Sequence, residues 1–179
     1  MENQRVRLSK TLMKDALVVI MKDKPFEKIT VYEICKTAGI NRSTFYKHYG
    51  SQSDVLADIE NDLFAALERH MLSSGCDLDN LVKVTQFLSS ESEKWRSLIN
   101  AVPSDEIISK IFTAKIVRTL MANHAWKLRS ARQEEYALLF FCTGGYGILR
   151  KWLNEGTVDS PEEIALLIIE LMGKVLKTD

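Results

Sequence analysis

Helix-start and helix-stop residues crowd the segment between Thr30 and Ser51, and they restrict its fold more than any other feature of the chain. Thr30 and Glu33 have the spacing of a capping box, in which a hydroxyl accepts from the amide three residues on and a carboxylate reaches back. Gly39 follows a short apolar pattern and suits the left-handed conformation in which helices often end. Asn41 is a suitable cap for a second helix. Two short helices joined by a glycine-containing turn are therefore predicted.

The angle between these two helices also has a sequence signal. Ile40 precedes the predicted cap and Phe45 follows it by four positions, which is the spacing of a hydrophobic staple. Two short helices, a tight turn and a contact that holds their angle are typical of a helix-turn-helix, whose second helix enters the major groove of DNA. Because Phe45 points inward, the outer face of that helix is predicted to carry Arg42, Ser43, Thr44, Tyr46 and Lys47.

The remainder of the chain is predicted to be helical as well, which makes the fold class all-α. Proline occurs three times, each time beside a predicted helix boundary, and no segment alternates apolar and polar residues long enough for a strand. The first helix places Leu12, Ala16 and Ile20 on one stripe, with Met13 and Leu17 beside it. Helix starts are predicted at Ser51 with Asp54, Ser90 with Glu93, Ser130 with Gln133 and Ser160 with Glu163. The corresponding later helices cover residues 78–89, 91–101, 105–124, 131–155 and 161–177.

Charge divides the chain into two parts. Residues 1–52 hold ten Lys and Arg against five Asp and Glu, whereas residues 53–179 hold fourteen against nineteen. A basic module followed by an acidic remainder indicates a polyanionic partner for the first part only. We therefore predict a DNA-binding domain over residues 1–52 and a helical bundle over residues 53–179.

Several other classes of protein are disfavoured by composition. The three cysteines form no zinc-binding spacing and His70 and His124 are isolated, so neither a metal nor another cofactor is predicted. The polar, basic start of the chain does not resemble a signal peptide, and no apolar run reaches the ~20 residues of a spanning helix. A cytoplasmic protein without membrane contact is expected.

The segment from Lys28 to Ser51 resembles the signature of the tetracycline-repressor (TetR) family. The similarity is carried by Ile-Thr-Val before the first short helix, Ala-Gly-Ile at the turn, and Thr-Phe-Tyr-x-His-aromatic in the second helix. It covers roughly residues 10–65, about a third of the chain. The resemblance implies a transcription regulator, most often a repressor, that binds a palindromic operator in double-stranded DNA as a homodimer.

The residues expected to contact DNA divide by chemistry. Arg42 has the planar fork that recognises guanine, and Ser43 can meet several base edges. Phosphate or backbone contacts are expected from Thr30, Tyr32, Thr44, Tyr46, Lys47, His48, Ser51 and Gln52. Gln52 departs from the lysine that is common in the family, so this position contributes a hydrogen bond without a charge.

The resemblance also implies that the last two long helices form the dimer interface. On these helices, two apolar stripes are expected to form it: Leu138, Phe141, Leu149 and Trp152, and Ile164, Ile168, Leu171, Met172 and Val175. Gly144, Gly145 and Gly147 are costly in an exposed helix and favour either the close approach of another helix or a break. The same stripes also fit the core of a monomer, and the sequence leaves that alternative open.

A ligand pocket is the least determined part of the prediction. Aromatic residues that could line it are Phe87, Trp95, Phe112, Trp126, Phe140 and Tyr146, although aromatics at helical spacing also fit an ordinary core. The low charge around them favours an apolar or cationic effector. Control by a partner protein, with no pocket, is the main alternative. A helical enzyme is disfavoured because the chain has no phosphate-binding glycine loop and no nucleophile or paired carboxylates beside a histidine.

Overall fold

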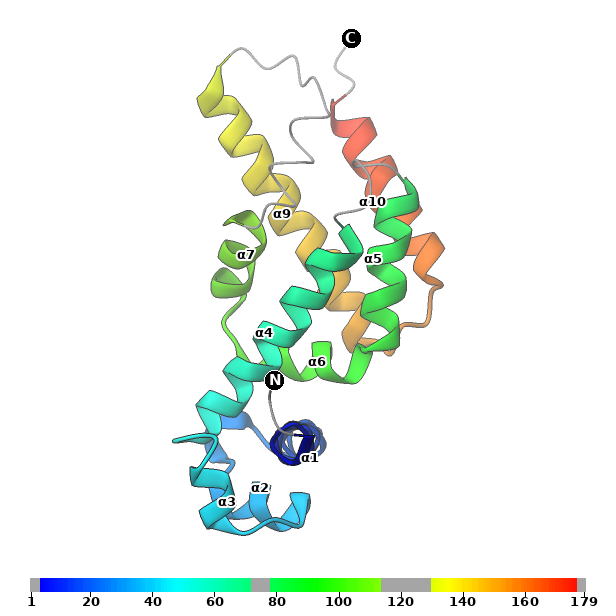
Figure 1. The fold of residues 1–179 in the computed structure, drawn as a ribbon. Helices are drawn as coiled ribbons and strands as arrows, with labels where there is room; N and C mark the ends of the chain where they lie inside the picture. The colour runs from blue at the N-terminus through cyan, green and yellow to red at the C-terminus, as the bar shows by residue number, and fades with distance from the viewer. Residues whose placement is uncertain (1–3, 72–77, 114–129, 177–179) are drawn as a thin grey trace. The chain divides into compact units, whose positions relative to one another are not determined.

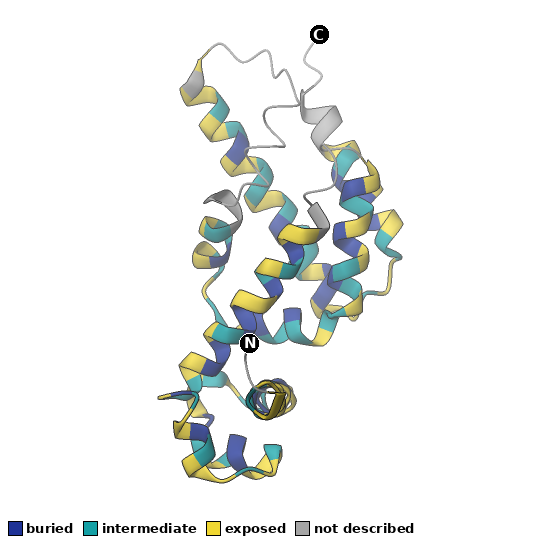
Figure 2. Ribbon diagram, in the orientation of Figure 1, coloured by how far each residue is buried: buried dark blue, intermediate teal, exposed yellow. Residues whose placement is uncertain are grey.

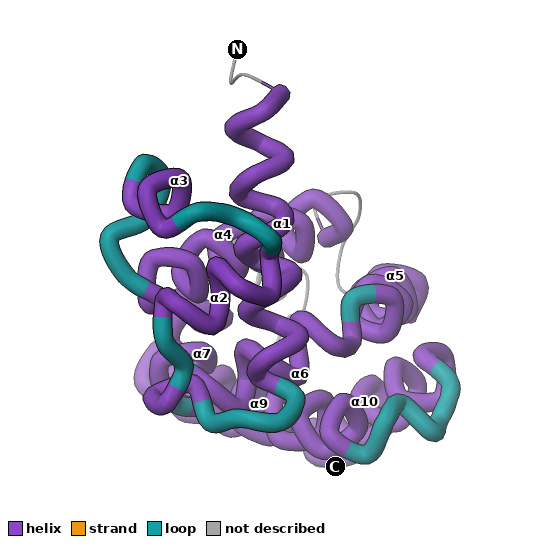
Figure 3. The backbone as a smooth tube through the Cα atoms, turned by 90° about the horizontal axis from the view of Figure 1, so that it is seen from below, coloured by secondary structure: helices purple, strands orange, loops and turns teal. Residues whose placement is uncertain are grey.

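A computed structural model describes residues 4–71, 78–113 and 130–176 of the protein. Within these ranges the regular structure consists of α-helices and one short 3-10 helix, and no strand is present (Figure 3). The all-α prediction is confirmed. The chain forms two compact units, Met1–Phe64 and Ala65–Asp179, which are described separately below.

The N-terminal unit contains three short or medium helices and the beginning of a long one (Figure 1). Its elements are α1 (Gln4–Met21), the 3-10 helix η1 (Phe26–Lys28), α2 (Val31–Ala38), α3 (Arg42–Tyr46) and the first part of α4 (Gln52–Met71). The core consists of side chains that are at most 2% exposed: Met13, Leu17, Ile29, Ile34, Phe45 and Val55. The domain boundary predicted between residues 52 and 53 falls at the start of α4, and the compact unit extends to Phe64.

The buried face of α1 differs from the predicted stripe. Ala16 is buried as expected, and so are Met13 and Leu17 beside the stripe. Leu12, however, is 39% exposed, and Val18 is buried in addition. The reason is that α1 packs against α2. The apolar positions of α1 extend around more than one face, so the neighbouring helix determines which of them are covered.

The C-terminal unit is a set of packed helices. They are α5 (Leu78–Ser90), α6 (Ser92–Ala101), α7 (Ser104–Thr113), α9 (Ala131–Asn154) and α10 (Pro161–Leu176). α10 lies along α5, and α9 contacts both α6 and α7. Polar bonds accompany the packing: the Thr85 hydroxyl donates to the Pro161 carbonyl at 2.8 Å, and Arg96 Nε donates to the Leu153 carbonyl at 2.8 Å. Figure 2 shows buried positions on each of these helices.

Most predicted helix boundaries in this unit are confirmed. Ser130 Oγ accepts from the amide of Gln133, and Ser160 and Glu163 exchange the bonds of a capping box at the start of α10. The cap predicted at Ser90 is wrong, because α5 continues through Ser90 and its hydroxyl donates back to the carbonyl of Phe87. The helix predicted from residue 105 begins at Ser104 as α7, and residues 114–124 of that prediction lie outside the described residues.

Candidate nucleic-acid interface

The start of α2 is held by reciprocal hydrogen bonds. The amide of Glu33 donates to Thr30 Oγ1 at 3.3 Å, while Glu33 Oε2 accepts from the amide of Thr30 at 2.9 Å. Lys24 Nζ lies 2.7 Å from the same carboxylate and adds an ion pair. The hydrogen bond from Lys24, followed by those from Thr30, lowers the pKa of Glu33 to about 2. The carboxylate is therefore fully ionised at neutral pH, and the predicted capping box is confirmed with an additional lysine.

The turn between α2 and α3 has the geometry of a Schellman motif. Gly39 adopts a φ of +66°, its amide donates to the Lys36 carbonyl at 3.4 Å, and the amide of Ile40 donates to the Cys35 carbonyl at 3.0 Å. Only glycine adopts this backbone conformation without a steric cost from Cβ. The role predicted for Gly39 is confirmed.

The second helix, α3, is short and is anchored by one buried ring. Asn41 occupies the cap position as predicted, but its side chain makes no capping hydrogen bond. Phe45 is fully buried, and its ring meets those of Tyr46 and Tyr49 at centroid distances of 5.5 and 5.9 Å. The inward orientation of Phe45 leaves the remaining residues of α3 on the outer face.

The structure places the predicted DNA-contacting residues on an accessible surface of the N-terminal unit. Tyr32 and Tyr46 are 61% and 52% exposed, which is unusual for large aromatic side chains that serve only packing. Arg42 Nη2 donates to Tyr46 Oη at 3.3 Å, with the guanidinium 5.9 Å from the ring centroid. The other exposed members are Thr30, Ser43 and Lys47, and the half-buried members are Thr44, His48, Ser51 and Gln52.

The amides before α4 already have an acceptor within the chain. Asp54 Oδ2 accepts from the amides of Gly50 at 2.7 Å and Ser51 at 3.0 Å, and the amide of Asp54 donates to Ser51 Oγ at 3.4 Å. This carboxylate occupies the position where a phosphate at Ser51 was predicted. A phosphate that approaches here must displace Asp54 or use the amides of Gln52 and Ser53, which come next in the helix.

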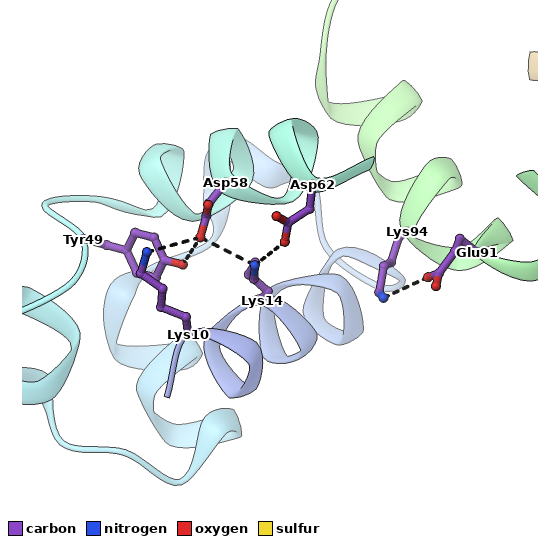
Figure 4. Close-up of polar contacts among 7 residues, drawn as sticks. All are labelled: Lys10, Lys14, Tyr49, Asp58, Asp62, Glu91 and Lys94. Atoms are coloured by element: carbon purple, nitrogen blue, oxygen red, sulfur yellow. Dashed lines mark hydrogen bonds and ion pairs between the residues drawn. The ribbon is translucent and has the colours of Figure 1, made fainter. Parts of the chain in front are cut away.

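A cluster of polar and charged residues, which was not predicted from the sequence, joins Tyr49 after α3 to α1 and α4 (Figure 4). The hydroxyl of Tyr49 donates to Asp58 Oδ2 at 2.6 Å, and the same oxygen lies 3.5 Å from Lys14 Nζ and 4.0 Å from Lys10 Nζ. Lys14 also pairs with Asp62. We call these five residues the Asp58 cluster. The available signal was Tyr49 itself, because a buried tyrosine hydroxyl usually requires a hydrogen-bond partner.

Asp58 is ionised at neutral pH although its side chain is partly buried. Burial acts to raise the pKa of its carboxyl, but the hydrogen bond from Tyr49 and the charges of Lys14 and Lys10 outweigh burial and hold the pKa below its usual value. The cluster therefore contains two cations and two anions, shared between α1 and α4.

The predicted pocket residues that the structure describes differ in burial, and one of them lies on the surface. Phe87 and Trp95 meet edge to face with a centroid distance of 6.3 Å, and Tyr146 is 8% exposed. Phe140 is 61% exposed, so its side chain lies on the surface of the chain instead of lining an interior site. Trp126 lies outside the described residues, as does the side chain of Phe112.

Two buried donor atoms on α9 have no acceptor among the described residues. Tyr146 Oη and Arg150 Nε have no partner among the described residues, although Arg150 Nη1 donates to Ser104 Oγ at 3.3 Å. Folded proteins leave few such groups unsatisfied. Tyr146 and Arg150 are four positions apart on α9 and thus lie on the same side of the helix.

The residues predicted to form the dimer interface divide into buried and exposed sets. Trp152, Ile164 and Ile168 are at most 6% exposed within one chain, so they have almost no area left for a partner. Leu138 is also buried, Phe141 and Leu149 are half-buried, and Leu171 is 43% exposed. The side chains of Met172 and Val175 are outside the described set.

The apolar surface that α9 and α10 leave exposed is formed largely by other residues. They are Tyr136, Leu139, Phe140, Leu166 and Leu167, in addition to the predicted Leu171, and each of the six is at least 43% exposed. A Cβ at Gly144, Gly145 or Gly147 would meet no atom within 4 Å. Among the described residues, no other helix therefore approaches these glycines closely.

None of the described helices is long and apolar enough to cross a membrane. Likewise, no three His, Cys, Asp or Glu side chains in the described ranges gather as metal ligands would.

The N-terminal unit is similar in sequence to known bacterial regulatory proteins. The sequence profile of the bacterial regulatory proteins of the tetR family matches residues 15–59, which include α2 and α3. A relative from Bacillus subtilis (strain 168), the uncharacterized HTH-type transcriptional regulator YxbF, is 22% identical over 171 residues. The match covers 90% of this chain and 44% of that relative, so the chain spans less than half of the relative's length.

Solved structures share the fold over nearly the whole chain. A TetR transcriptional regulator from Streptococcus agalactiae 2603V has a TM-score of 0.74 and 19% identity, with 94% of this chain and 96% of that chain covered. The fatty acid degradation regulator FadR from Bacillus halodurans has a TM-score of 0.72 and 12% identity, with 96% and 97% covered. The predicted arrangement of a helix-turn-helix unit followed by a helical unit is confirmed as a TetR-like fold.

Proposed function

We propose that the chain is a member of the TetR family of bacterial regulatory proteins and acts as a cytoplasmic, dimeric repressor that binds a palindromic operator through α3. The observation that carries the proposal is the outer face of α3. Arg42, Ser43 and Lys47 are exposed there, and the buried Phe45 ring fixes the opposite side of the helix. A short, anchored helix with an exposed polar face is what entry into the major groove requires.

The work of binding is divided between two kinds of contact. Arg42 recognises a guanine through its O6 and N7 atoms, and Ser43 meets an adjacent base edge. Thr44, Tyr46, Lys47 and His48 contact phosphates, which set the register without reading the sequence. Further contacts with the DNA backbone come from two other helix starts. These are the exposed Thr30 and Tyr32 at the start of α2, and Ser51 and Gln52 at the start of α4.

Selection of binding sites from random duplex DNA tests this function directly. The enriched sequence should be a palindrome whose half-sites lie about one or two helical turns apart, because a two-fold symmetric dimer presents its α3 helices at that spacing. A reporter gene placed behind the selected sequence should then be expressed less when the protein is present. Recovery of no enriched sequence would overturn the proposal, and increased expression would make the protein an activator.

Dimerisation through α9 and α10 is the second part of the proposal. The exposed apolar residues on these helices form a surface that water solvates poorly, and such a surface on a soluble protein marks an interaction site. The open space beside Gly144, Gly145 and Gly147 would admit a helix of a second copy. Two-fold pairing through a single patch also matches the symmetry of a palindromic operator.

Control by a small molecule is the third part, and the two unsatisfied donors on α9 support it. An acceptor group on a ligand would complete Tyr146 Oη and Arg150 Nε, while the aromatic residues nearby in the sequence would accept an apolar body. These donors suit an oxygen acceptor better than a cation. The coupling to DNA binding need be only ~1–3 kcal/mol to change operator occupancy substantially.

The variant Tyr146→Phe tests the effector. Without ligand it should raise the free energy of unfolding by about 1 kcal/mol, because it removes a buried hydroxyl that has no partner in the described part of the chain. It should also abolish any change in operator affinity that octanoate causes in the wild-type protein. Octanol and octylamine are the matched probes, because they differ from octanoate only in the polar end. If none of the three probes changes the melting temperature or operator binding of the wild-type protein, control by a partner protein becomes the better proposal.

A further inference from the structure

The orientation of α3 depends strongly on what happens at its C-terminal end. The helix has only five residues, too few to be stable by itself. Its N-terminal cap, Asn41, contributes no side-chain bond. The backbone leaves α3 through a turn in which the amide of Tyr49 donates to the Phe45 carbonyl at 3.0 Å. Tyr49, three residues after the end of α3, is thus placed so that its side chain can attach the helix to another element.

Tyr49 is attached to α4 by a strong hydrogen bond. The distance of 2.6 Å between its hydroxyl and Asp58 Oδ2 is in the range of bonds from a hydroxyl to an ionised carboxylate, which are stronger than bonds between neutral groups. The tyrosine is only 6% exposed, so water competes little for its side chain. Its ring also contacts Phe45 and lies 5.8 Å from the ammonium group of Lys10.

Asp58 is itself fixed by groups from a third element. Lys14 and Lys10, both on α1, lie 3.5 and 4.0 Å from the same carboxylate oxygen that accepts the Tyr49 hydroxyl (Figure 4). A single oxygen atom thus joins α1, α4 and the turn after α3. Because these contacts restrict the Asp58 carboxylate, they also restrict the position of the Tyr49 hydroxyl that donates to it.

Base-edge contacts need this precision more than phosphate contacts do. A bidentate contact with a guanine requires the side chain to be held within about 0.5 Å of its productive position. Contacts with phosphates are long-range and tolerate displacement, and they supply most of the binding to unrelated sequences. Any loosening of α3 should therefore affect binding to the operator more than binding to other DNA.

We infer that Asp58, through its bond to Tyr49, is a positioning residue that sets the orientation of α3 and so the sequence specificity of the protein. The inference rests on the proposed DNA-binding function. Without the bond, α3 would occupy its productive orientation only part of the time, and the apparent affinity for the operator would fall in proportion to that fraction.

The test uses Tyr49→Phe, which keeps the ring and removes only the hydroxyl, in the full-length protein. The affinities for the selected operator duplex and for a scrambled duplex of equal length are measured over a salt series. We expect the ratio of the two affinities to fall by about three- to tenfold, with an unchanged salt slope because no phosphate contact is lost. A fall in melting temperature with an unchanged ratio would show that the bond is structural only, and would overturn the inference.

A double-mutant cycle approaches the same bond from the other side. Asp58→Ala should lower the specificity ratio, and adding Tyr49→Phe should lower it no further, because the bond is already lost. This variant also releases two lysines from a counter-charge, so its affinity for scrambled DNA should rise. Additive effects of the two substitutions would overturn the inference. If Tyr49→Phe does not fold, an unchanged ratio in Asp58→Ala alone would overturn it.

Asp62→Ala is the matched control for charge. Asp62 lies on the same helix one turn further on and pairs with Lys14, so this variant makes the same change in net charge without removing the bond to Tyr49. It should raise the affinity for both duplexes in parallel and keep the ratio. If the wild-type protein selects no operator at all, the proposed function fails, whereas a preserved ratio in Tyr49→Phe refutes only the role of Asp58.

Discussion

At the scale of single residues, Arg42 and Lys47 illustrate two ways in which a cation can act on the same helix. Arg42 donates to the Tyr46 hydroxyl and its guanidinium lies 5.9 Å from the ring centroid, so its planar group is partly oriented before DNA arrives. Lys47 is exposed, and its ammonium group is a compact charge on a flexible stem. The first suits a directional contact with a base, and the second suits a phosphate.

Substitution of these two residues should separate specificity from affinity. Arg42→Ala should cost ~1–3 kcal/mol of operator binding and relax the preference at one base pair in each half-site. Lys47→Ala should weaken binding to operator and scrambled duplexes alike and reduce the salt slope by about one for each half-site. Titrations of both duplexes over a salt series measure both effects. An equal loss on both duplexes for Arg42→Ala would transfer the base-reading role to Ser43 or Thr44.

At the scale of elements, the start of α2 combines two kinds of interaction on one carboxylate. Glu33 closes the capping box with Thr30 and also pairs with Lys24. Its pKa in the folded protein is about 2, below its ordinary value of 4.5. A depressed pKa of an acid stabilises the fold above the unfolded pKa, and this stabilisation is lost as the pH falls through the folded pKa.

The stability difference between wild-type protein and Glu33→Gln should therefore depend on pH. The wild type should be more stable from neutral pH down to about 4.5, and the difference should disappear as the pH approaches 2. Thermal unfolding at a series of pH values measures it. Glu163→Gln is the control, because Glu163 closes the capping box of α10 with Ser160. Added salt should reduce the effect of Glu33→Gln more than that of Glu163→Gln, since an ion pair is screened. An equal response to salt would exclude a contribution from Lys24.

At the scale of the whole molecule, α10 presents two different apolar surfaces. Ile168 is 6% exposed and belongs to the core of the chain, whereas Leu171, less than one turn further on, is 43% exposed. An obligate dimer usually buries about 2,000 Å² of surface or more. Only the exposed residues can supply that area.

Charges at the two positions should have different outcomes. Leu171→Glu should give a folded monomer, because the glutamate lies on a surface that water can reach once the partner is absent. Ile168→Asp should unfold the chain or make it insoluble, because an unpaired carboxylate in the core costs several kcal/mol, about 3 or more. Size-exclusion chromatography with light scattering and circular dichroism distinguish these outcomes. A wild-type protein that is monomeric at tens of micromolar would contradict dimerisation through this surface.

The sequence by itself determined the features that depend on neighbours within about five residues. The capping boxes at Thr30 and Ser160, the left-handed Gly39 and the position of Asn41 were all predictable, because each rests on local backbone chemistry. The inward orientation of Phe45 followed from the same local spacing. For this reason the helical class and the helix-turn-helix could be predicted together, down to the exposed residues of α3.

The tertiary structure alone decided which apolar face each helix buries and which distant residues meet. An apolar stripe shows that a helix has a covered side, but it does not identify the helix that covers it. Leu12 was therefore expected inside and is exposed, and Phe140 was expected to line a pocket and lies on the surface. The bond between Tyr49 and Asp58 joins the turn after α3 to α4, and its ion pairs with Lys10 and Lys14 depend on how α1 packs. No local pattern encodes such pairs, because they form only when separate helices are brought together by the burial of their apolar sides.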